Sequence, residues 1–367
     1  MIDDPLPAFA PPGPLDSGAA PLLQVTPKGI YCAAGDFYID PWRPVERAII
    51  THAHSDHARP GSAHYLASPT GALVLRHRVQ PGALIQQQPW GEAVSMGGVR
   101  VSLHPAGHIL GSAQVRVEHA GRVWVVSGDY KTRPDATCEA FEPLRCDVFI
   151  TECTFGLPVY RWPAEAQVAS ELHAWWAGNQ ALGRTSVVLA YALGKAQRVL
   201  GMLDAAQGPI GIHGALARFV EEYRAAGRPM PPVLDATVAG ASELRGCGLV
   251  VAPPSAAAST WLRRFGDCSV AMASGWMQVR GVRRRQGVDR GFVLSDHADW
   301  PGLLEAIRAT GASTVLATHG NTGPFVRYLR EEMKLDAHAL ATQFRGEAVD
   351  DMPADEQHEP GAQAIDT

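Results

Sequence analysis

The chain has 367 residues, of which 46% are hydrophobic and 19% are charged, a composition typical of a folded, soluble protein with a large core or two domains. No apolar run approaches the ~20 residues that a membrane span needs, and Asp3 and Asp4 stand where a secretory signal would carry basic residues. We therefore expect a cytoplasmic protein without a membrane partner. The net charge of −5 would by itself argue against a polyanionic partner.

Short apolar strands alternate with helical stretches along the chain. Strands are predicted at residues 45–51, 99–103, 113–118, 122–127 and 148–151, and Gly121 suits a hairpin turn before the fourth of them. From about residue 164 the pattern changes, because helices at 164–180 and 196–206 flank a strand at 186–190, an alternation that favours a parallel sheet. Strands at 292–294 and 314–317 bracket a helix at 301–310.

Three imidazoles and a carboxylate crowd together directly after the first of these strands, at His52, His54, Asp56 and His57. In extended backbone, residues two apart share a face, so His52 and His54 can close on one ion, and the turn that follows points Asp56 and His57 toward a second. Borderline ions such as zinc take imidazole and carboxylate ligands, and two ions roughly 3.5–4 Å apart serve displacement reactions. The alternative is a surface turn that happens to be rich in histidine.

Three further side chains of the same kind stand at strand ends or on glycine-rich turns, where loops collect catalytic groups. His108 lies in the glycine-flanked stretch 106–112, and Asp129 follows an apolar run and can bridge two ions with its two oxygens. His319 repeats the strand-to-His-Gly pattern near the end of the fold. Each residue taken singly is better explained as a structural one, but the set together with the first cluster predicts a metal site.

Two other positions carry candidate chemistry. His297 stands between Asp296 and Asp299, which we expect to hold its ring and raise its pKa. Lys195 follows Gly194 at a predicted helix start, where it either anchors a phosphate or is an ordinary exposed side chain.

The distribution of charge changes the first impression of an acidic chain. Residues 346–367 carry seven acids and residues 1–20 carry three, both without lysine or arginine, so residues 21–345 have a net charge of +5. We expect both ends to be disordered extensions. The densest basic run fits phosphate contacts as well as it fits a solvated loop. It comprises Arg280, Arg283, Arg284, Arg285 and Arg290, with Arg263 and Arg264 nearby in the sequence.

The six cysteines are scattered without any C-x-x-C pair, which indicates neither a zinc knuckle nor a dithiol redox motif. We expect them to be reduced and mostly buried. They are Cys32, Cys138, Cys146, Cys153, Cys247 and Cys268.

The order of the metal-type motifs, His-x-His-x-Asp-His, then Gly-His, then Ser-Gly-Asp, then a late His-Gly, resembles the metallo-β-lactamase superfamily. The segment introduced by residues 151–156 and closed by residues 295–297 is similar to that of the β-CASP nucleases, whose additional domain caps the metal cleft. The resemblance covers roughly residues 28–345. It implies an α/β fold, with a metallo-β-lactamase αββα sandwich formed by residues 21–160 and 286–345, and an inserted α/β β-CASP domain formed by residues 161–285.

The resemblance also assigns individual residues. Glu152, His297 and His319 match the β-CASP motifs A, B and C. Asp40 matches the structural aspartate that precedes the first histidine cluster, with Asp36 as the weaker candidate.

The resemblance is divided between DNA and RNA enzymes. Residues 31–42 are similar to those of the bacterial ligase-associated DNA exonucleases, and residues 154–163 resemble the run after motif A in the DNA crosslink-repair nucleases. Residues 190–197 resemble the RNA 3′-end-processing endonucleases instead, and His319 stands where eukaryotic DNA-specific enzymes usually have valine. We expect exonucleolytic DNA hydrolysis in repair, beside an ATP-dependent DNA ligase and a helicase, with an RNA-processing ribonuclease as the alternative.

The expected cofactors are two divalent ions, zinc or else manganese, which would activate a water and offset the charge on phosphorus. His297, oriented by Glu152, would protonate the leaving oxygen; the alternative for Glu152 is a solvated acid at a strand end. Ion one would take His52, His54, His108 and Asp129, and ion two would take Asp56, His57, Asp129 and His319.

Two other functional classes fit the sequence less well than a nuclease. A small-molecule hydrolase of the lactamase or glyoxalase type lacks the insertion between Glu152 and His297. A non-catalytic nucleic-acid-binding relative would have lost metal ligands, whereas this chain keeps all seven.

Overall fold

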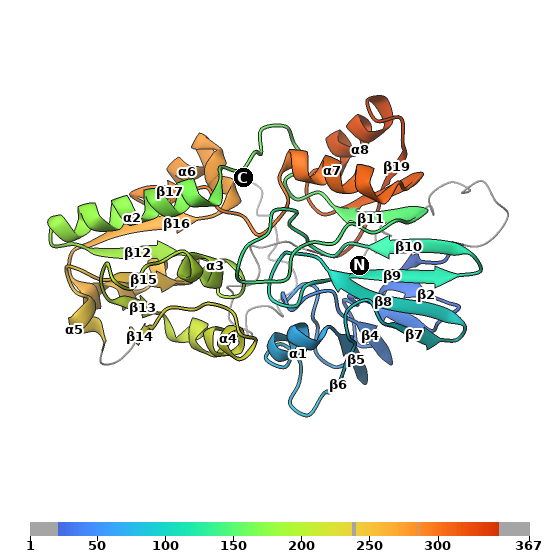
Figure 1. Cartoon of the computed structure of the whole chain (residues 1–367), viewed down its shortest axis with the longest axis horizontal. Coiled ribbons are helices and arrows are strands. Elements are labelled where there is room, and N and C mark those ends of the chain that lie inside the picture. Colours follow the sequence, from blue (N-terminus) through green and yellow to red (C-terminus); the bar gives the residue numbers. More distant parts are fainter. Residues whose placement is uncertain (1–20, 237–239, 286, 345–367) are drawn as a thin grey trace, which may run out of the picture.

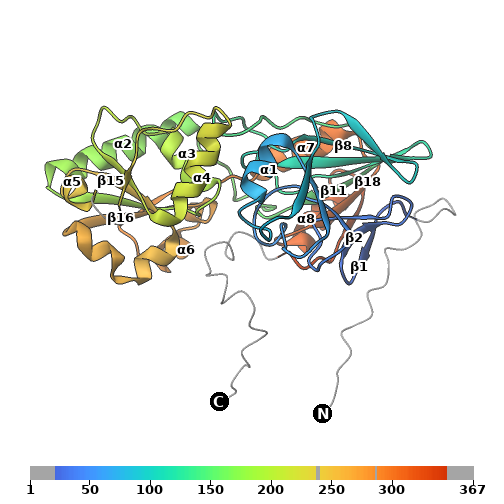
Figure 2. The ribbon, with the colours of Figure 1, turned by 90° about the horizontal axis from the view of Figure 1, so that it is seen from below.

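The computed structural model of the protein describes residues 21–236, 240–285 and 287–344. These residues form three sheets and their covering helices, which confirms a mixed α/β protein. The chain folds into two lobes that lie side by side (Figures 1 and 2). The predicted disordered ends, residues 1–20 and 346–367, lie outside the described residues.

The first lobe begins with a six-stranded sheet in the order β1-β2-β3-β4-β5-β6. Its strands are β1 (Gln24–Thr26), β2 (Gly29–Cys32), β3 (Phe37–Ile39), β4 (Arg47–Ile49), β5 (His64–Ala67) and β6 (Leu84–Gln87). The strands from β3 to β6 run parallel. Helix α1 (Pro69–Leu75) connects β5 to β6, and it starts where the side chain of Ser68 accepts a hydrogen bond from the amide of Gly71.

A second sheet of seven strands completes the first lobe, in the order β19-β18-β11-β10-β9-β8-β7. Its strands are β7 (Ala93–Met96), β8 (Val99–Pro105), β9 (Ala113–His119), β10 (Arg122–Val126), β11 (Val148–Glu152), β18 (Thr314–Thr318) and β19 (Asp336–Ala339). Strands β9 and β10 form the predicted hairpin at Gly121. Strands β10, β11 and β18 run parallel as neighbours, so their carboxyl ends meet at one edge of the sheet.

The two sheets pack face to face around a shared apolar core. Phe37 and Ile39 of the first sheet lie in the same buried cluster as Val115 and Trp124 of the second. Helices α7 (Trp300–Thr310) and α8 (Thr322–Glu331) cover the other face of the second sheet, as Figure 1 shows. Helix α1 packs against the outer face of the first sheet, so the lobe has the layer order helix, sheet, sheet, helix.

The second lobe contains an entirely parallel sheet in the order β14-β13-β15-β12-β16-β17, which confirms the prediction from the β-α alternation. Its strands are β12 (Thr185–Leu189), β13 (Ile210–Ile212), β14 (Leu234–Asp235), β15 (Leu249–Ala252), β16 (Cys268–Ala273) and β17 (Arg290–Phe292). Its helices are α2 (Glu165–Ala181), α3 (Lys195–Gly201), α4 (Gly214–Ala225), α5 (Ala241–Leu244) and α6 (Arg280–Arg285), with 3₁₀ turns at Pro254–Ala258, Thr260–Phe265 and Gly275–Gln278. Among the helices described, none combines the length and the apolar character of a membrane span.

Three expectations about these elements need comment. Strand β17 belongs to the third sheet, so the second lobe extends past the predicted return at residue 286. Helix α3 ends at Gly201 and not at residue 206, and in the segment that follows the carboxylate of Asp204 accepts the amide of Ala206. All six cysteines are free, and four are buried, as expected.

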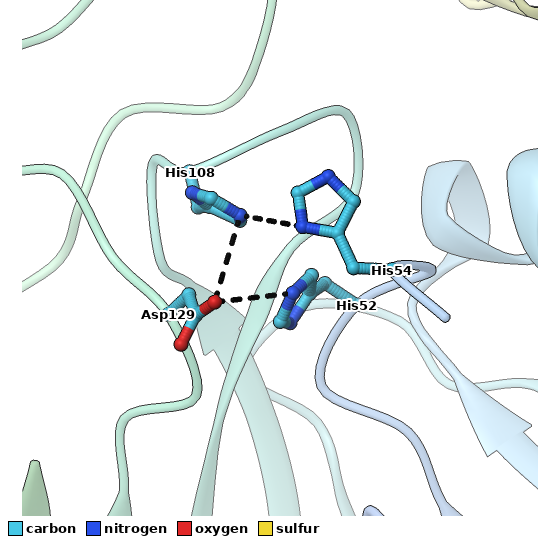
Figure 3. A group of neighbouring side chains, drawn as sticks. All are labelled: His52, His54, His108 and Asp129. Atoms are coloured by element: carbon cyan, nitrogen blue, oxygen red, sulfur yellow. Dashed lines mark hydrogen bonds and ion pairs between the residues drawn. The ribbon is translucent and has the colours of Figure 1, made fainter. Parts of the chain in front are cut away.

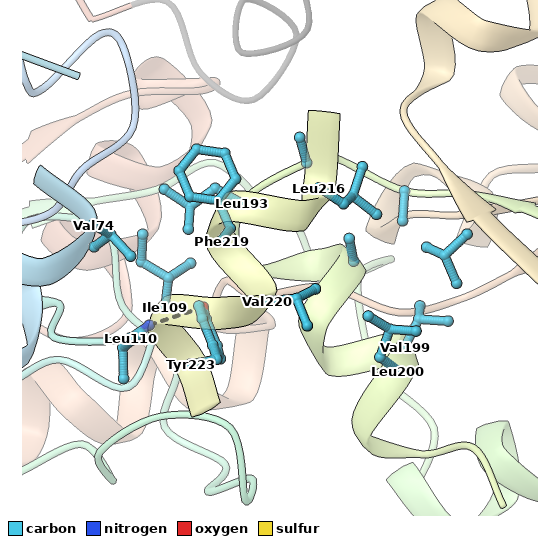
Figure 4. Close-up of a cluster of buried hydrophobic side chains, with 14 of the residues drawn as sticks. Val74, Ile109, Leu110, Leu193, Val199, Leu200, Leu216, Phe219, Val220 and Tyr223 are labelled. Carbon is cyan, nitrogen blue, oxygen red and sulfur yellow. Dashed lines mark hydrogen bonds between the residues drawn. The ribbon is translucent and has the colours of Figure 1, made fainter. Parts of the chain in front are cut away.

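A single apolar cluster joins the two lobes (Figure 4). Val74 of α1 and the loop residues Ile109 and Leu110 pack against side chains of α3 and α4. The hydroxyl of Tyr223 on α4 accepts a hydrogen bond from the amide of Leu110, 3.1 Å away. The second lobe is therefore fixed directly against the loop that carries His108.

The same loop sets a test of the packing. Gly111 has a left-handed backbone (φ +71°), and a Cβ added there would lie 1.9 Å from the amide nitrogen of Gly71 in α1. Gly121 has nearly the same backbone (φ +76°) with no atom within 4 Å of an added Cβ. Gly121→Ala should lower the free energy of unfolding by ~1–2 kcal/mol, the cost of a left-handed backbone at alanine. Gly111→Ala should lower it by clearly more, because its Cβ would also clash with α1. Equal losses in urea denaturation would contradict this close approach.

Candidate metal centre

The predicted site residues come together at the edge where the strands of the first lobe end. Asp129 follows β10, Glu152 is the last residue of β11, and His319 follows β18. These three parallel strands are neighbours, so their following residues meet. The histidine cluster at 52–57 arrives from the end of β4, and His108 arrives from the loop between β8 and β9.

The first group of side chains comprises His52, His54, His108 and Asp129, whose ligand atoms lie within 4.8 Å of one another (Figure 3). Oδ2 of Asp129 is 3.5 Å from Nε2 of His52 and 3.9 Å from Nε2 of His108. His108 Nε2 and His54 Nδ1 are 3.0 Å apart. All four residues are buried.

The second group comprises Asp56, His57 and His319. Nε2 of His57 is 3.9 Å from Asp56 and 3.7 Å from Oδ2 of Asp129. The other oxygen of Asp129, Oδ1, faces Nε2 of His319 at 3.8 Å. Asp129 therefore contacts both groups, one oxygen facing His319 and the other the rings of His52, His57 and His108.

A third contact places His297 beside these groups. Its Nδ1 donates a hydrogen bond of 2.7 Å to Glu152, whose carboxylate also accepts the amide of Tyr130. This is the hydrogen bond expected between Glu152 and His297, and the acids near His297 in the sequence, Asp296 and Asp299, make contacts of their own. Asp299 caps helix α7, and the backbone carbonyl of Asp296 accepts a hydrogen bond from His108.

Asp40 holds the second group from behind. It lies at the end of β3 with a left-handed backbone (φ 44°), and its carboxylate accepts the amide of Thr51 at 2.7 Å and Nδ1 of His57 at 2.7 Å. When the ring is neutral with its proton on Nδ1, Nε2 of His57 carries the lone pair on the side of Asp129. Asp36, the other candidate for this place, is exposed and pairs with Arg47.

Burial keeps several of these imidazoles neutral. It lowers the pKa of His52 and of His108, and it lowers the pKa of His319 to about 4. A neutral imidazole offers a lone pair, which is the form that binds metal.

Carboxylates accumulate around His57. Burial disfavours its charged form, but three surrounding carboxylates outweigh burial and raise its pKa to about 10. These belong to Asp56, Asp129 and Asp40. Burial also raises the pKa of Asp129 to about 7. Such an excess of buried acids is the environment that a divalent cation stabilises.

The donor set fits metal ions. His54 and His108 each direct one ring nitrogen at a backbone carbonyl, which can only accept a proton. In neutral rings the remaining nitrogens, 3.0 Å apart, then face each other with lone pairs, an arrangement that a cation between them relieves. Among the described residues, Nε2 of His52, Nε2 of His57 and both ring nitrogens of His319 are buried without a hydrogen-bond partner. Buried polar atoms of this kind need an explanation, and metal coordination supplies one.

The residues predicted to contact phosphate differ in their exposure to solvent. Lys195 is fully buried and lies 3.7 Å from Asp296, so it is not an ordinary exposed side chain. Arg280 and Arg284 on α6 are exposed, and Arg290 pairs with Glu171 at 3.1 Å. Arg263 is exposed, Arg264 is half-buried, and the side chains of Arg283 and Arg285 lie outside the described ones.

Two neighbours of the site were not predicted. The ring of Phe344 stacks on His57 and on His319, with centroids 4.4 and 4.8 Å apart. The carbonyl of Leu193 in the second lobe lies 3.1 Å from Nε2 of His54. A carbonyl leaves no signal in the sequence, and a lone phenylalanine near the acidic tail gives no reason to place it over the site.

No family model matches the chain. It is 32% identical over 314 residues to a "Probable DNA ligase" from Opitutus terrae, a match covering 85% of this chain and 30% of that protein. It is 32% identical over 126 residues to "Cleavage and polyadenylation specificity factor subunit 3" from Dictyostelium discoideum, covering 33% of this chain and 16% of that protein. "Endoribonuclease YSH1" from Saccharomyces cerevisiae is 29% identical over 124 residues, covering 33% of this chain and 15% of that protein.

The chain thus spans less than a third of the length of each of these relatives. A crystal structure of a protein of unknown function from Enterococcus faecalis shares the fold, with a TM-score of 0.56 at 11% identity, covering 82% of this chain and 80% of that chain. The matches to the two RNA-processing relatives support the resemblance to the metallo-β-lactamase superfamily.

Proposed function

We propose that this protein is a two-metal phosphodiesterase that hydrolyses DNA. The observation that carries the proposal is the carboxylate of Asp129, which lies within 4 Å of ring nitrogens from both histidine groups. The first lobe is the metallo-β-lactamase sandwich in this proposal, and the second lobe is the β-CASP cap. The layer order of the first lobe and the parallel sheet of the second support this assignment.

The proposed substrate follows from how much of the chain each relative matches. The similarity to the Probable DNA ligase extends over 85% of this chain, which favours DNA as the substrate. Exonucleolytic cleavage in repair and a functional association with a ligase and a helicase remain part of the proposal from the sequence. The similarity to the endoribonuclease extends over 33% of it, which makes RNA cleavage the second candidate.

Each proposed residue has a separate task. When bound, the two ions, zinc or manganese, would activate a water and offset the negative charge of the phosphodiester. Asp129 keeps the two ligand groups at a fixed separation. His297, held at 2.7 Å by the Glu152 carboxylate, presents its ring to the same space and protonates the leaving oxygen.

We propose that a nucleic-acid strand lies in a groove at Trp162, whose lining also includes the acid Glu171. It has a volume of about 370 Å³ and is lined by the exposed Arg161, the indole of Trp162 and the side chain of Gln278. The indole nitrogen of Trp162 donates a hydrogen bond of 2.9 Å to the carbonyl of His297. A cation and an aromatic ring are the groups that hold a phosphate and stack a base in single-strand binding.

The substrate is tested by incubating end-labelled single-stranded DNA, duplex DNA and RNA of matching sequence with zinc or manganese. We expect metal-dependent cleavage of DNA, abolished by a chelator and faster than that of RNA, with mononucleotides appearing first. Faster cleavage of RNA than of DNA would favour the ribonuclease over the DNA nuclease. Activity that survives chelation would refute the two-metal proposal.

The role of His297 is tested with two substrates. His297→Ala should retain the metals and slow DNA cleavage by ~10²–10⁴-fold, because a positioned acid contributes about that much to proton transfer. The loss should be much smaller on an aryl phosphodiester, whose departing oxygen needs no proton. Equal losses on both substrates would mean that His297 positions the phosphate, and lost metal would place it among the ligands.

A further inference from the structure

The first metal group depends on contacts from outside its own lobe. His54 directs Nε2 at the carbonyl of Leu193, 3.1 Å away, in the connection between β12 and α3 of the second lobe. His108 directs Nδ1 at the carbonyl of Asp296, 2.8 Å away, in the segment that returns from β17. Each contact fixes the ring and its tautomer, which leaves the other nitrogen facing the ligand group.

Two buried cations on α3 hold the residue that supplies the second of these carbonyls. Lys195 lies 3.7 Å from one oxygen of the Asp296 carboxylate, and Arg198 lies 3.6 Å from the other. Arg198 also donates a hydrogen bond to the carbonyl of Ser295. Lys195 is 0% exposed and Arg198 is 8% exposed. Charges buried to this extent are stable only when they are paired, so Asp296 has little freedom to move.

The turn before α3 packs closely against the loop that carries His108. Gly194 has a left-handed backbone (φ +92°), and an added Cβ would lie 2.3 Å from Ile109, the residue next to His108. Arg198 continues the ion network into the first lobe through Asp135, 3.5 Å away, which in turn pairs with Lys131. The apolar contacts of Figure 4 bind α3 and α4 to the loop of His108, and the ion network joins α3 to Asp296 and Asp135.

We infer that Lys195 and Arg198 are positioning residues for the first metal group, and that this group is complete only while the second lobe is docked. The inference rests on the proposed two-metal function. The two cations fix Asp296 and the adjoining turn, so that His54 and His108 present their nitrogens to the same ion. Ion binding and docking of the lobes then stabilise each other, because the ion binds only the docked arrangement tightly.

The experiment measures metal binding and not activity. Cobalt(II) is titrated into the metal-free full-length protein, followed by calorimetry and by the visible absorption of histidine-bound cobalt. The wild type should bind two ions. Lys195→Met and Arg198→Met should each weaken one of them by ~10–100-fold, the usual effect of removing a group that orients a ligand, and leave the other unchanged. Lys195→Arg, which keeps the positive charge, should retain much of the affinity that Lys195→Met loses.

Arg184→Met provides the matched control. Arg184 precedes β12, at the opposite end of that strand from the turn, and pairs with Asp267 at 3.2 Å. This variant loses an ion pair of the same lobe and should bind both ions as the wild type does. Unchanged affinity for both ions in Lys195→Met and Arg198→Met would overturn the positioning role of these residues and leave the proposed function standing. A wild type that binds no ion would instead overturn the proposed function.

Hydrogen exchange supplies a second measurement on the wild type, which needs no variant to fold. Cobalt(II) should slow the exchange of backbone amides at residues 193–198 and 295–297, because the bound ion holds the lobes together. No change in exchange at these residues, with both ions bound, would overturn the coupling between the first metal group and the second lobe.

Discussion

The carboxylate of Asp129 is buried within 4 Å of ring nitrogens from four histidines, and the arrangement of the whole site depends on this contact. Its position follows from the topology, because β10 ends beside β11 and β18 in a parallel run. Residues that follow these strands are therefore brought to one point although they are far apart in the sequence. The first sheet brings His52, His54 and His57 to the same edge through β4, and His108 comes from the loop between β8 and β9.

The site is held from three sides. Asp40 orients His57 from within the first sheet, and Glu152 orients His297 from the end of β11. Leu193 of the second lobe supplies the carbonyl that faces His54, and Asp296, in the segment that returns from β17, supplies the one that faces His108. If the second lobe both lines the proposed substrate groove and completes the first ligand group, it would connect substrate access to metal binding.

The sequence predicted which side chains would gather, because metal-type residues at strand ends carry a strong local signal. Two histidines spaced two residues apart after a predicted strand, and an acid after an apolar run, can be recognised from the amino-acid sequence alone. The structure brings every one of these residues to the same edge, while their roles as ligands stay a prediction. The parallel sheet of the second lobe was also predictable from its alternation of strands and helices.

The unpredicted features are those set by tertiary contacts. Asp296, which the sequence places beside His297, offers its backbone carbonyl to His108, and this contact has no signal in the sequence. Lys195 looked like a surface residue or a phosphate anchor, and its burial against Asp296 depends on how the lobes meet. Helix α3 ends before the predicted residue 206, and strand β17 pairs with β16 beyond the predicted boundary at residue 286. Apolar periodicity encodes neither feature.

The central claim is that Asp129 bridges two ions, and metal analysis of Asp129→Ala tests it most directly. After dialysis against zinc and then against metal-free buffer, the wild type should retain two ions per chain, and Asp36→Ala, which removes an exposed acid, should retain the same number. Asp129→Ala should lose affinity for both ions, since it removes a ligand from each group. Two ions retained by Asp129→Ala, or one ion lost with the other held as tightly as before, would contradict the bridge.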